Sequence, residues 1–432
     1  MPDGAGNETV FALASAEGRA GVAVVRVSGA KAFDAVETLC GAVPAPRTTS
    51  LRILCDADGS IIDEALVLTF AAGASFTGEA VAEFHCHGSP AVIRRLLGRL
   101  GDMPGLCMAA PGEFTRRAFE NGNLDLTRVE GLGDLIDAET EAQRKQAMAI
   151  YDGQLSKALE SVRGHLLRGA ALCEAGIDFA DEEVPEDVDG PTRDALEAVS
   201  GEIETILRGH EQARLITNGL EVAIIGAPNV GKSTLLNAIA GDDIAIVTEV
   251  AGTTRDVIEC RVNLGGRLVT FLDTAGLRDT DDIVEREGIR RAEIRAQRAD
   301  MRLFLSMVPE EDHPLLQAGD IKVLTKSDVS GSPDGISAKT GAGVAELLEE
   351  IEKSVALRTK GAGLVSSERQ AYLLKQAASH TDSALATLVT GVGSELVAHH
   401  IRDALRSVEE IVGRVGVEEV LGEIFSSFCI GK

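Results

Sequence analysis

A glycine-rich segment in the middle of the chain ends in a lysine and a serine, residue types that hold phosphate groups and their metal ions. Residues 226–233 read Gly-Ala-Pro-Asn-Val-Gly-Lys-Ser, after an apolar run at 221–226 and before a helical run at 235–240. This is the G-x-x-x-x-G-K-S pattern in the strand–loop–helix context that it requires. Its glycines let backbone N–H groups turn toward phosphate oxygens, and the helix N-terminus adds positive potential. We therefore expect Lys232 to reach the β- and γ-phosphates of a nucleotide and Ser233 to bind Mg²⁺.

A second acidic motif follows at a spacing typical of nucleotide hydrolases. The strand-like run 267–273 ends in Asp273, followed by Thr274, Ala275 and Gly276. We expect Asp273 to hold Mg²⁺ through water and the Gly276 N–H to contact the γ-phosphate. Between the two motifs, residues 248–256 are rich in hydroxyl side chains and lie where a segment that senses the γ-phosphate belongs.

The nucleotide base is predicted from two further motifs. Residues 323–328, Val-Leu-Thr-Lys-Ser-Asp, resemble the guanine-reading Asn-Lys-x-Asp element, with Asp328 accepting hydrogen bonds from the base N1 and N2 groups. A Ser-Ala-Lys run follows at 337–339. The four elements in this order favour GTP over ATP. Thr325 replaces the usual Asn and offers no amide to contact guanine N7 and bridge to the first loop, so we expect guanine selectivity to be relaxed while Asp328 keeps the base preference.

The expected GTP-binding residues come from these four elements. They are Asn229, Val230, Gly231, Lys232, Ser233, Thr234, Thr248, Glu249, Val250, Ala251, Gly252, Thr253, Thr254, Asp273, Thr274, Ala275, Gly276, Thr325, Lys326, Asp328, Ser337, Ala338 and Lys339.

Leu277 stands where Ras-like enzymes carry the glutamine that orients the attacking water. Because leucine cannot orient water, either hydrolysis is very slow or another residue takes this role. The carboxylates nearby are Asp279, Asp281, Asp282, Glu285 and Glu287. Spacing alone leaves all of them open, and the alternative is a solvated acidic start of a helix.

Length, composition and charge limit the classes of protein to consider. At 432 residues the chain is long enough for several domains, and it has no apolar run long enough to cross a membrane. Its start lacks the apolar core of a secretion signal. Its seven scattered cysteines form no Cys-x-x-Cys pair, which favours reduced thiols in a cytoplasm. The net charge of −26 and 3% aromatic content argue against strong direct binding of nucleic acid, so a partner is expected to supply any basic surface.

The pattern of elements predicts a multidomain chain that combines α/β and all-α parts. Strand-like runs at 21–27, 65–70 and 81–87 and a helix beginning near Pro90 indicate an α+β domain over residues 1–118. Residues 119–216 and 358–432 have helical periodicity, interrupted by an acidic loop at 178–187. Between them, residues 217–357 carry the nucleotide motifs. We therefore predict a discontinuous helical domain into which a nucleotide-binding domain is inserted, which requires only that the inserted domain's termini lie close together.

Several short motifs together resemble the MnmE (TrmE) family of tRNA-modification GTPases over essentially the whole chain. They are the segments 21–29, Phe76-Thr-Gly-Glu79, Pro111-Gly-Glu-Phe114, 177–183, Gly252-Thr-Thr-Arg-Asp256, 273–278 and the terminal Phe428-Cys-Ile-Gly-Lys432. The phosphate-binding loop is generic, whereas its combination with a Cys-x-Gly-Lys terminus is specific. The resemblance implies an N-terminal tetrahydrofolate-binding α+β domain that also dimerises, a helical domain, and an inserted Ras-like G domain.

The resemblance also implies an activity and partners. Proteins of this kind form homodimers, and with an FAD-dependent partner called MnmG (GidA) they form a heterotetramer. Together they install a carboxymethylaminomethyl or aminomethyl-type group on C5 of the wobble uridine, position 34, of certain tRNAs. The implied one-carbon donor is 5-formyl- or 5,10-methylene-tetrahydrofolate, and the partner is expected to provide most of the tRNA-binding surface.

Site residues follow from the resemblance by motif position. Glu285 matches the water-orienting carboxylate, and Ser233 and Thr254 match the Mg²⁺ ligands. A K⁺ site that stabilises charge during phosphoryl transfer matches Asn229, Thr248, Val250 and Thr253. The folate contacts match Arg26, Glu83, Lys432 and Asn123, the last being a lysine in most of the family.

Two questions stay open at this stage. Cys429 is either a nucleophile near the folate or the tRNA, or an inert thiol packed with the apolar run 424–430, which we expect to dock against another part of the chain. The function itself has two alternatives, a ribosome-assembly GTPase and a nucleotide-gated scaffold in which Leu277 marks lost hydrolysis. Without the resemblance, Arg26 and Glu83 would be interpreted as a partly buried ion pair with no special function.

Overall fold

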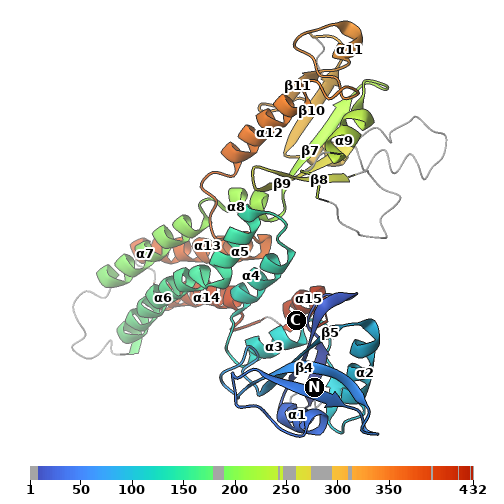
Figure 1. Cartoon of the computed structure of the whole chain (residues 1–432). Helices are drawn as coiled ribbons and strands as arrows, with labels where there is room; N and C mark the ends of the chain where they lie inside the picture. The colour runs from blue at the N-terminus through green and yellow to red at the C-terminus, as the bar shows by residue number, and fades with distance from the viewer. Residues whose placement is uncertain are drawn as a thin grey trace, which may run out of the picture. The chain divides into compact units, whose positions relative to one another are not determined.

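The computed structural model describes residues 8–178, 189–241, 244–246, 259–273, 294–309, 314–390, 393–416, 418–428 and 430–431. The chain divides into two compact units, Met1–Gly133 with Glu409–Lys432, and Asp134–Val408 (Figure 1). The domain boundaries at 118/119, 216/217 and 357/358 were predicted from the sequence, and they stay a prediction. The units group the chain differently, because the last segment, 409–432, packs with the N-terminal residues.

The first unit is built on a mixed sheet with strand order β3-β4-β5-β2-β1-β6 within the described residues. Neighbouring strands are antiparallel except β1 and β6, which are parallel. Its elements are β1 (Thr9–Leu13), β2 (Ala20–Ser28), α1 (Ala32–Cys40), β3 (Ser50–Cys55), β4 (Ile61–Phe70), β5 (Val81–Gly88), α2 (Pro90–Gly101), β6 (Leu106–Met108), α3 (Glu113–Glu120), α4 (Leu126–Asp137), and α15 (Glu418–Ser427). The strands expected at 21–27, 65–70 and 81–87, and the helix expected near Pro90, are confirmed.

Alternation along β2 and β5 gives this sheet two different faces. Val25, Val27 and Phe84 are fully buried in one core cluster with residues of α1 and α2. Because successive strand side chains point to opposite faces, Arg26 and Glu83 project from the other face, and they are directly paired in the β2–β5 register. The sheet therefore uses its apolar face for stability and presents a charged pair on the other.

The C-terminal segment packs against the N-terminal residues of the same unit. The rings of Phe119 and Phe425 lie 6.5 Å apart between centroids, and Phe425 and Phe428 are buried. Gly112 has a φ of 67°, and a Cβ there would be 2.6 Å from the Phe425 carbonyl oxygen, so this approach requires glycine. Ile430 forms an antiparallel bridge with Pro111. The expectation that the apolar tail docks is confirmed for its described residues.

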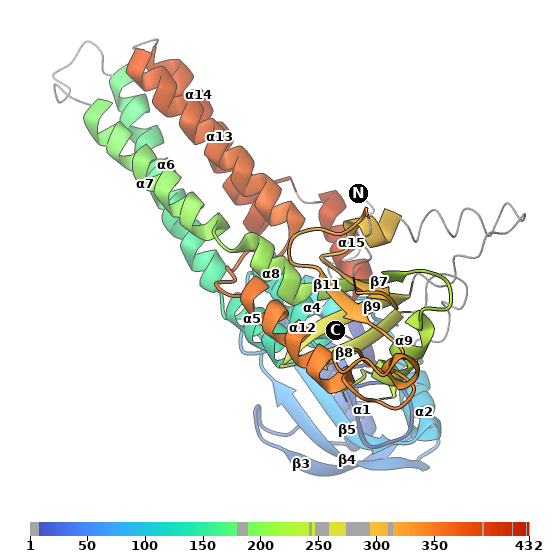
Figure 2. The same cartoon turned by 90° about the horizontal axis from the view of Figure 1, so that it is seen from above.

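In the second unit, the segments before and after the nucleotide motifs in the chain are helical. Long helices run side by side in Figure 2, and α5 begins with a capping box between Thr140 and Gln143. No helix in the described residues is long and apolar enough to cross a membrane. The helices of this part are α5 (Glu141–Tyr151), α6 (Gln154–Asp178), α7 (Asp189–Leu207), α8 (His210–Thr217), α13 (Glu368–Thr390) and α14 (Ser394–Val412).

Segments that precede and follow the nucleotide motifs in the chain lie next to each other. The Gly363 N–H donates to the Gly209 carbonyl at 2.9 Å, and His210 Nδ1 lies 3.0 Å from the Val365 carbonyl oxygen. The intervening residues can therefore form a separate layered structure without stretching the chain, which is the geometry that an insertion requires.

That intervening structure is a sheet with strand order β11-β10-β7-β9-β8, parallel except for β8. Leu236, Ile239 and Phe271 belong to the core on one face, together with Ile351 of α12, while Phe304 belongs to a smaller cluster with Ala223 and Ile225. Its elements are β7 (Leu220–Gly226), α9 (Lys232–Ala240), β8 (Glu259–Leu264), β9 (Arg267–Asp273), β10 (Met301–Ser306), β11 (Ile321–Leu324), α11 (Ser327–Ser330) and α12 (Val344–Arg358).

One buried ion pair ties β10 to the loop that precedes β11. Arg302 Nε donates to Asp320 Oδ2 at 2.7 Å, and the two side chains are 4% and 1% exposed. Burial raises the pKa of Asp320, but hydrogen bonds from Arg302 and from the Gln317 backbone outweigh it, so the net shift is downward. The carboxylate is therefore stabilised in its charged form.

We predict that Asp320→Asn lowers the local unfolding free energy at β10 by about 3–5 kcal/mol, because it leaves the buried Arg302 charge uncompensated. Hydrogen exchange of the β10 amides in the full chain measures this quantity. Glu141→Gln is the matched control, since its pair with Arg144 is half exposed and should change little. Because the folded pKa of Asp320 is lowered, the parent should lose this stabilisation only as pH falls below about 4, whereas the variant lacks it throughout. An unchanged exchange rate in Asp320→Asn would contradict the assignment.

Candidate functional site

The phosphate-binding loop connects β7 to α9 and has the backbone that its sequence predicts. Gly226 has a φ of 150°, and a Cβ there would collide with the Leu305 carbonyl of the neighbouring strand β10, so only glycine fits. Asn229 has a φ of 61°, a left-handed conformation that asparagine tolerates, and its side chain is exposed. Gly231 precedes the first turn of α9, whose N-terminal N–H groups face the loop.

Lys232 and Ser233 are the first two residues of α9. Lys232 contacts the start of its own loop, and Ser233 contacts the predicted site residue Asp273. Lys232 Nζ donates to the carbonyl oxygens of Gly226 at 2.7 Å and Ala227 at 3.1 Å. Burial lowers the pKa of Lys232, and the nearby Asp273 opposes this shift. The ammonium is therefore partly desolvated, which strengthens its attraction for an anionic phosphate.

The Ser233 hydroxyl donates to Asp273 Oδ2 at 2.8 Å, which joins the loop to the end of β9. A hydroxyl and a carboxylate are hard oxygen donors of the kind that bind Mg²⁺ together with phosphate oxygens and water. The donor set of Ser233 and Asp273 therefore fits the ion that the motif implies.

The guanine element lies beside the same loop. Thr325 is buried, and its hydroxyl donates to the Val230 carbonyl at 2.8 Å. We expected that a threonine at this position could not bridge to the first loop. This expectation is wrong, because the threonine side chain, although shorter than that of asparagine, reaches the Val230 backbone carbonyl. The contact that an amide would make to guanine N7 still has no equivalent in Thr325.

The two base-binding motifs are held together by backbone hydrogen bonds. The Ile336 N–H donates to the Leu324 carbonyl at 2.7 Å, and the Ser327 N–H donates to the Ile336 carbonyl at 3.1 Å. Asp328 on α11 and Lys339 are exposed, whereas Ser337 is buried. The carboxylate that is expected to read the base is therefore free to meet it from a fixed backbone.

Many predicted site residues lie outside the described residues. They are Thr248, Glu249, Val250, Ala251, Gly252, Thr253, Thr254, Thr274, Ala275, Gly276, Glu285, Cys429 and Lys432.

A second constellation lies on the charged face of the sheet in the first unit. Arg26 Nε donates to Glu83 Oε1 at 2.9 Å, and the side chains are 22% and 14% exposed. The Arg26 guanidinium lies over the rings of Phe114 and Phe76, 5.4 and 5.9 Å from their centroids. This cation–π arrangement orients the guanidinium. The two aromatic residues belong to the motifs Phe76-Thr-Gly-Glu79 and Pro111-Gly-Glu-Phe114, but sequence reasoning assigned them no contact.

Asn123 lies beside this constellation but supports it indirectly. Its Nδ2 donates to the carbonyls of Ser75 at 3.1 Å and Phe76 at 3.0 Å. The amide thus fixes the loop that carries the Phe76 ring. In the described residues, these bonds occupy the donor group that a folate contact would need.

An arginine-centred network supports the same loop. Arg117 Nη1 donates to Glu79 at 3.1 Å, and its Nε donates to Glu113 Oε1 at 3.0 Å. The Ser28 hydroxyl at the end of β2 donates to Glu79 Oε2 at 2.6 Å. Sequence reasoning quoted Glu79 and Glu113 within family motifs without giving them a role. The pair of Glu113 with Arg117 spans four residues of α3 and is readable from the sequence. The contacts of Glu79 are not, because they join residues 38 and 51 positions apart.

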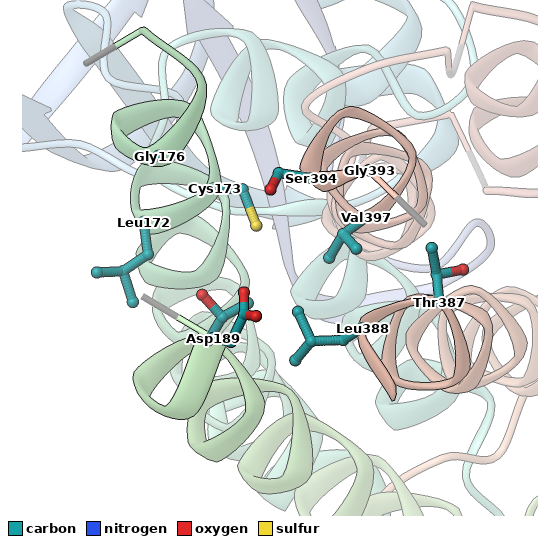
Figure 3. A pocket seen from close by; sticks show the side chains of 10 residues that line it. Leu172, Cys173, Gly176, Asp189, Thr387, Leu388, Gly393, Ser394 and Val397 are labelled. Carbon is teal, nitrogen blue, oxygen red and sulfur yellow. The ribbon is translucent and has the colours of Figure 1, made fainter. Parts of the chain in front are cut away.

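A pocket of about 140 Å³ lies between α6, α7, α13 and α14 (Figure 3). Leu388 and Val397 point toward the Cys173 thiol, whose pKa is raised by burial. Asp189 supplies a carboxylate at its edge. The described lining combines aliphatic side chains with a protonated thiol, a carboxylate and hydroxyl groups, and it includes no cationic side chain. Neither nucleotide nor folate is therefore assigned to this pocket.

Comparisons with known proteins cover both units. Residues 126–429 match the family model described as the MnmE helical domain, and residues 9–123 match the model described as the GTP-binding protein TrmE N-terminus. The tRNA modification GTPase MnmE of Roseobacter denitrificans is 52% identical over 430 residues, which cover 98% of this chain and 100% of the relative. The protein with the same description from Dinoroseobacter shibae is 50% identical over 432 residues, with the same coverage.

Among solved structures, an Era variant of Aquifex aeolicus bound to GDP·AlF4⁻ is 27% identical. The match covers 31% of this chain and 56% of that one, with a TM-score of 0.25. At this TM-score the likeness adds no weight to the full-length relationships.

We predict that Thr325→Val weakens GTP binding about tenfold, because it removes the hydrogen bond that holds the Val230 backbone and leaves a buried carbonyl unpaired. Titration with a fluorescent GTP analogue measures the dissociation constant. Thr340→Val, on the exposed loop nearby, is the control and should bind like the parent. Equal affinity in Thr325→Val and the parent would show that the bridge does not support the site.

The missing N7 contact gives a separate prediction. The parent should bind GTP and 7-deaza-GTP with similar affinity, since Thr325 offers no donor amide to N7. Thr325→Asn introduces that amide and should favour GTP over the deaza analogue by roughly five- to tenfold, the worth of one hydrogen bond. A parent that already discriminates against 7-deaza-GTP to this extent would show that another residue reads N7.

Proposed function

The chain belongs to the MnmE family of tRNA modification GTPases, and from this premise we propose that it is a K⁺-dependent GTPase that modifies C5 of the wobble uridine in certain tRNAs. It does so with the FAD-dependent MnmG partner and adds a carboxymethylaminomethyl or aminomethyl-type group. The observation that supports this most is the junction of Lys232, Ser233 and Asp273 in a chain related over its full length to such GTPases. Family membership favours this role over ribosome assembly or a scaffold without hydrolysis.

In the proposed hydrolysis, the residues of the first loop position the phosphates. The Lys232 ammonium neutralises charge on the β- and γ-phosphates, while Ser233, Thr254 and Asp273 are proposed to hold Mg²⁺. Since Leu277 cannot orient water, Glu285 positions the attacking molecule. A K⁺ bound beside the phosphates through Asn229, Thr248, Val250 and Thr253 would supply the positive charge that an arginine supplies in other GTPases.

The charged face of the first unit is the proposed tetrahydrofolate site. The Glu83 carboxylate can accept from the adjacent N–H groups of a pterin, and the Arg26 guanidinium, fixed by Phe76 and Phe114, can meet an anionic or carbonyl oxygen. Lys432 is proposed to complete the contacts, and Asn123 supports them indirectly by holding the Phe76 loop.

The position of the C-terminal tail supports a role for Cys429 in one-carbon transfer. Its neighbour Ile430 bridges Pro111, three residues before Phe114, and Phe114 lies under the Arg26 guanidinium. Cys429 is therefore proposed to face the one-carbon unit as a nucleophile.

A homodimer through the first unit is supported by apolar side chains that the unit leaves uncovered. Leu51 and Leu66 are paired across β3 and β4 and are 56% and 44% exposed, and Ile53 on the same strand as Leu51 is 49% exposed. Contiguous exposed aliphatic side chains mark interaction surfaces. We also propose a cytoplasmic heterotetramer with MnmG. The net charge of −26 supports the part of this proposal in which MnmG supplies most of the tRNA-binding surface.

We predict that Glu285→Ala lowers GTP turnover on the order of 10²-fold while GTP affinity stays nearly unchanged, because the residue acts only on the attacking water. Glu287→Ala is the matched control two residues away and should retain turnover.

The same assay should show that Na⁺ does not replace K⁺ in the parent, and that Asn229→Ala removes the K⁺ response. Equal turnover of Glu285→Ala and parent, or equal turnover in Na⁺ and K⁺, would remove the corresponding assignment.

For Cys429→Ser we expect normal K⁺-dependent GTP turnover and loss of wobble-uridine modification, since a hydroxyl is hardly ionised near neutral pH. Mass spectrometry of tRNA nucleosides from cells that carry the variant measures the modification. The control is Cys40→Ser: burial raises the pKa of Cys40 to about 11, so that thiol is no nucleophile and its replacement should preserve modification. Full modification by Cys429→Ser would show that the thiol only packs, and loss of both activities would indicate a docking defect.

A further inference from the structure

Two histidines and an aspartate from neighbouring helices converge on one point of the helical part, and none of them belongs to either site described above. His380 lies on α13, and His400 and Asp403 lie on α14. One potential ligand atom from each of the three side chains lies within 4.8 Å of the others. All three side chains are partly buried, so the cluster is not a chance meeting of fully extended surface groups.

The fold itself creates this convergence. α13 and α14 are successive helices that run side by side (Figure 2). His400 and Asp403 are three residues apart on one helix, a spacing that places both on the same face. The imidazole of His380 comes from the facing helix, and its ring centroid is 6.5 Å from that of His400.

One ring nitrogen of this cluster lacks a partner. His400 Nδ1 is buried from solvent, and the described residues offer it no hydrogen bond. A buried polar atom without a partner costs free energy, so such atoms in folded proteins usually bind something. His400 therefore has a ring nitrogen with no partner among the described residues, and such a nitrogen is available to bind a further group.

Asp403 is also held by a neighbouring side chain. His399, on the same helix, lies with its Nε2 3.4 Å from Asp403 Oδ2. Ligating carboxylates are commonly held by a hydrogen bond to one oxygen while the other meets the metal. His399 therefore acts as a support for Asp403, and its own side chain is largely exposed.

We propose that His380, His400 and Asp403 bind a divalent transition-metal ion of the Zn²⁺ class, with water at the remaining position. Two imidazoles and one carboxylate suit such an ion, whereas Mg²⁺ and Ca²⁺ prefer sites made of oxygen alone. Donor atoms that share one Zn²⁺ lie roughly 3 to 4 Å apart, because each bond is about 2.0–2.2 Å long. The three atoms, which lie within 4.8 Å of one another, are close to this separation. The bound ion would cross-link α13 to α14.

The test uses the full, untagged chain, first stripped of metal and kept free of nucleotide and Mg²⁺. Co²⁺ is added as a spectroscopic substitute and Zn²⁺ in a calorimetric titration. We expect one ion per chain, with visible Co²⁺ absorption but without the charge-transfer band of a thiolate ligand, since the site has only nitrogen and oxygen donors. Zn²⁺ should also raise the melting temperature, because it binds the folded state alone.

Three variants and one control decide the assignment. His380→Ala, His400→Ala and Asp403→Asn should each weaken binding on the order of 10²-fold and remove the shift in melting temperature. Asp403→Asn keeps the side-chain shape and serves where a histidine variant does not fold. His165→Ala, which removes an imidazole paired with Glu202 on other helices, should bind like the parent. Absence of stoichiometric binding in the parent, a thiolate band, or unchanged affinity in Asp403→Asn would overturn the proposal.

Discussion

Parallel pairing of β7 with β9 and β10 is the constraint on which the nucleotide site depends. Because the strands run in one direction, their carboxyl ends meet at one edge of the sheet, and ligands of such sheets bind there. Gly226 ends β7 and Asp273 ends β9, so the phosphate loop and the magnesium-binding carboxylate are brought together by register alone. The 2.8 Å bond from Ser233 to Asp273 follows from this register. A slip of one residue would turn the Asp273 side chain to the other face.

The sequence predicted the nucleotide loop well because backbone geometry decides its residues. Gly226 and Asn229 occupy conformations that few residue types adopt, so their identities report local structure directly. Contacts that depend on long-range packing were harder to predict from the sequence. The reach of the Thr325 hydroxyl to Val230 was missed, because side-chain length says nothing about where a distant backbone carbonyl lies.

The two side-chain constellations outside the nucleotide site show the same limit. The interpretation of Arg26 and Glu83 as a partly buried ion pair is confirmed, and the pair follows from the β2–β5 register. The two rings over Arg26 come from separate segments and were not predicted. His380 lies twenty positions from His400. This separation does not predict that the two side chains meet, because that depends on how α13 packs against α14. Histidine spacing within one helix is readable from sequence, whereas spacing across a helix pair is not.

The bridge between Pro111 and Ile430 has a consequence for how the protein is made. During synthesis, Pro111 leaves the ribosome long before Ile430, and all of the second unit emerges between them. The first unit must therefore wait for its closing segment while its neighbours fold, even though domains usually complete their folding in order of synthesis. The apolar surface that Phe425 and Phe428 cover stays exposed until then. Translational pausing before this segment would prolong exposure of that apolar surface and with it the demand for chaperones.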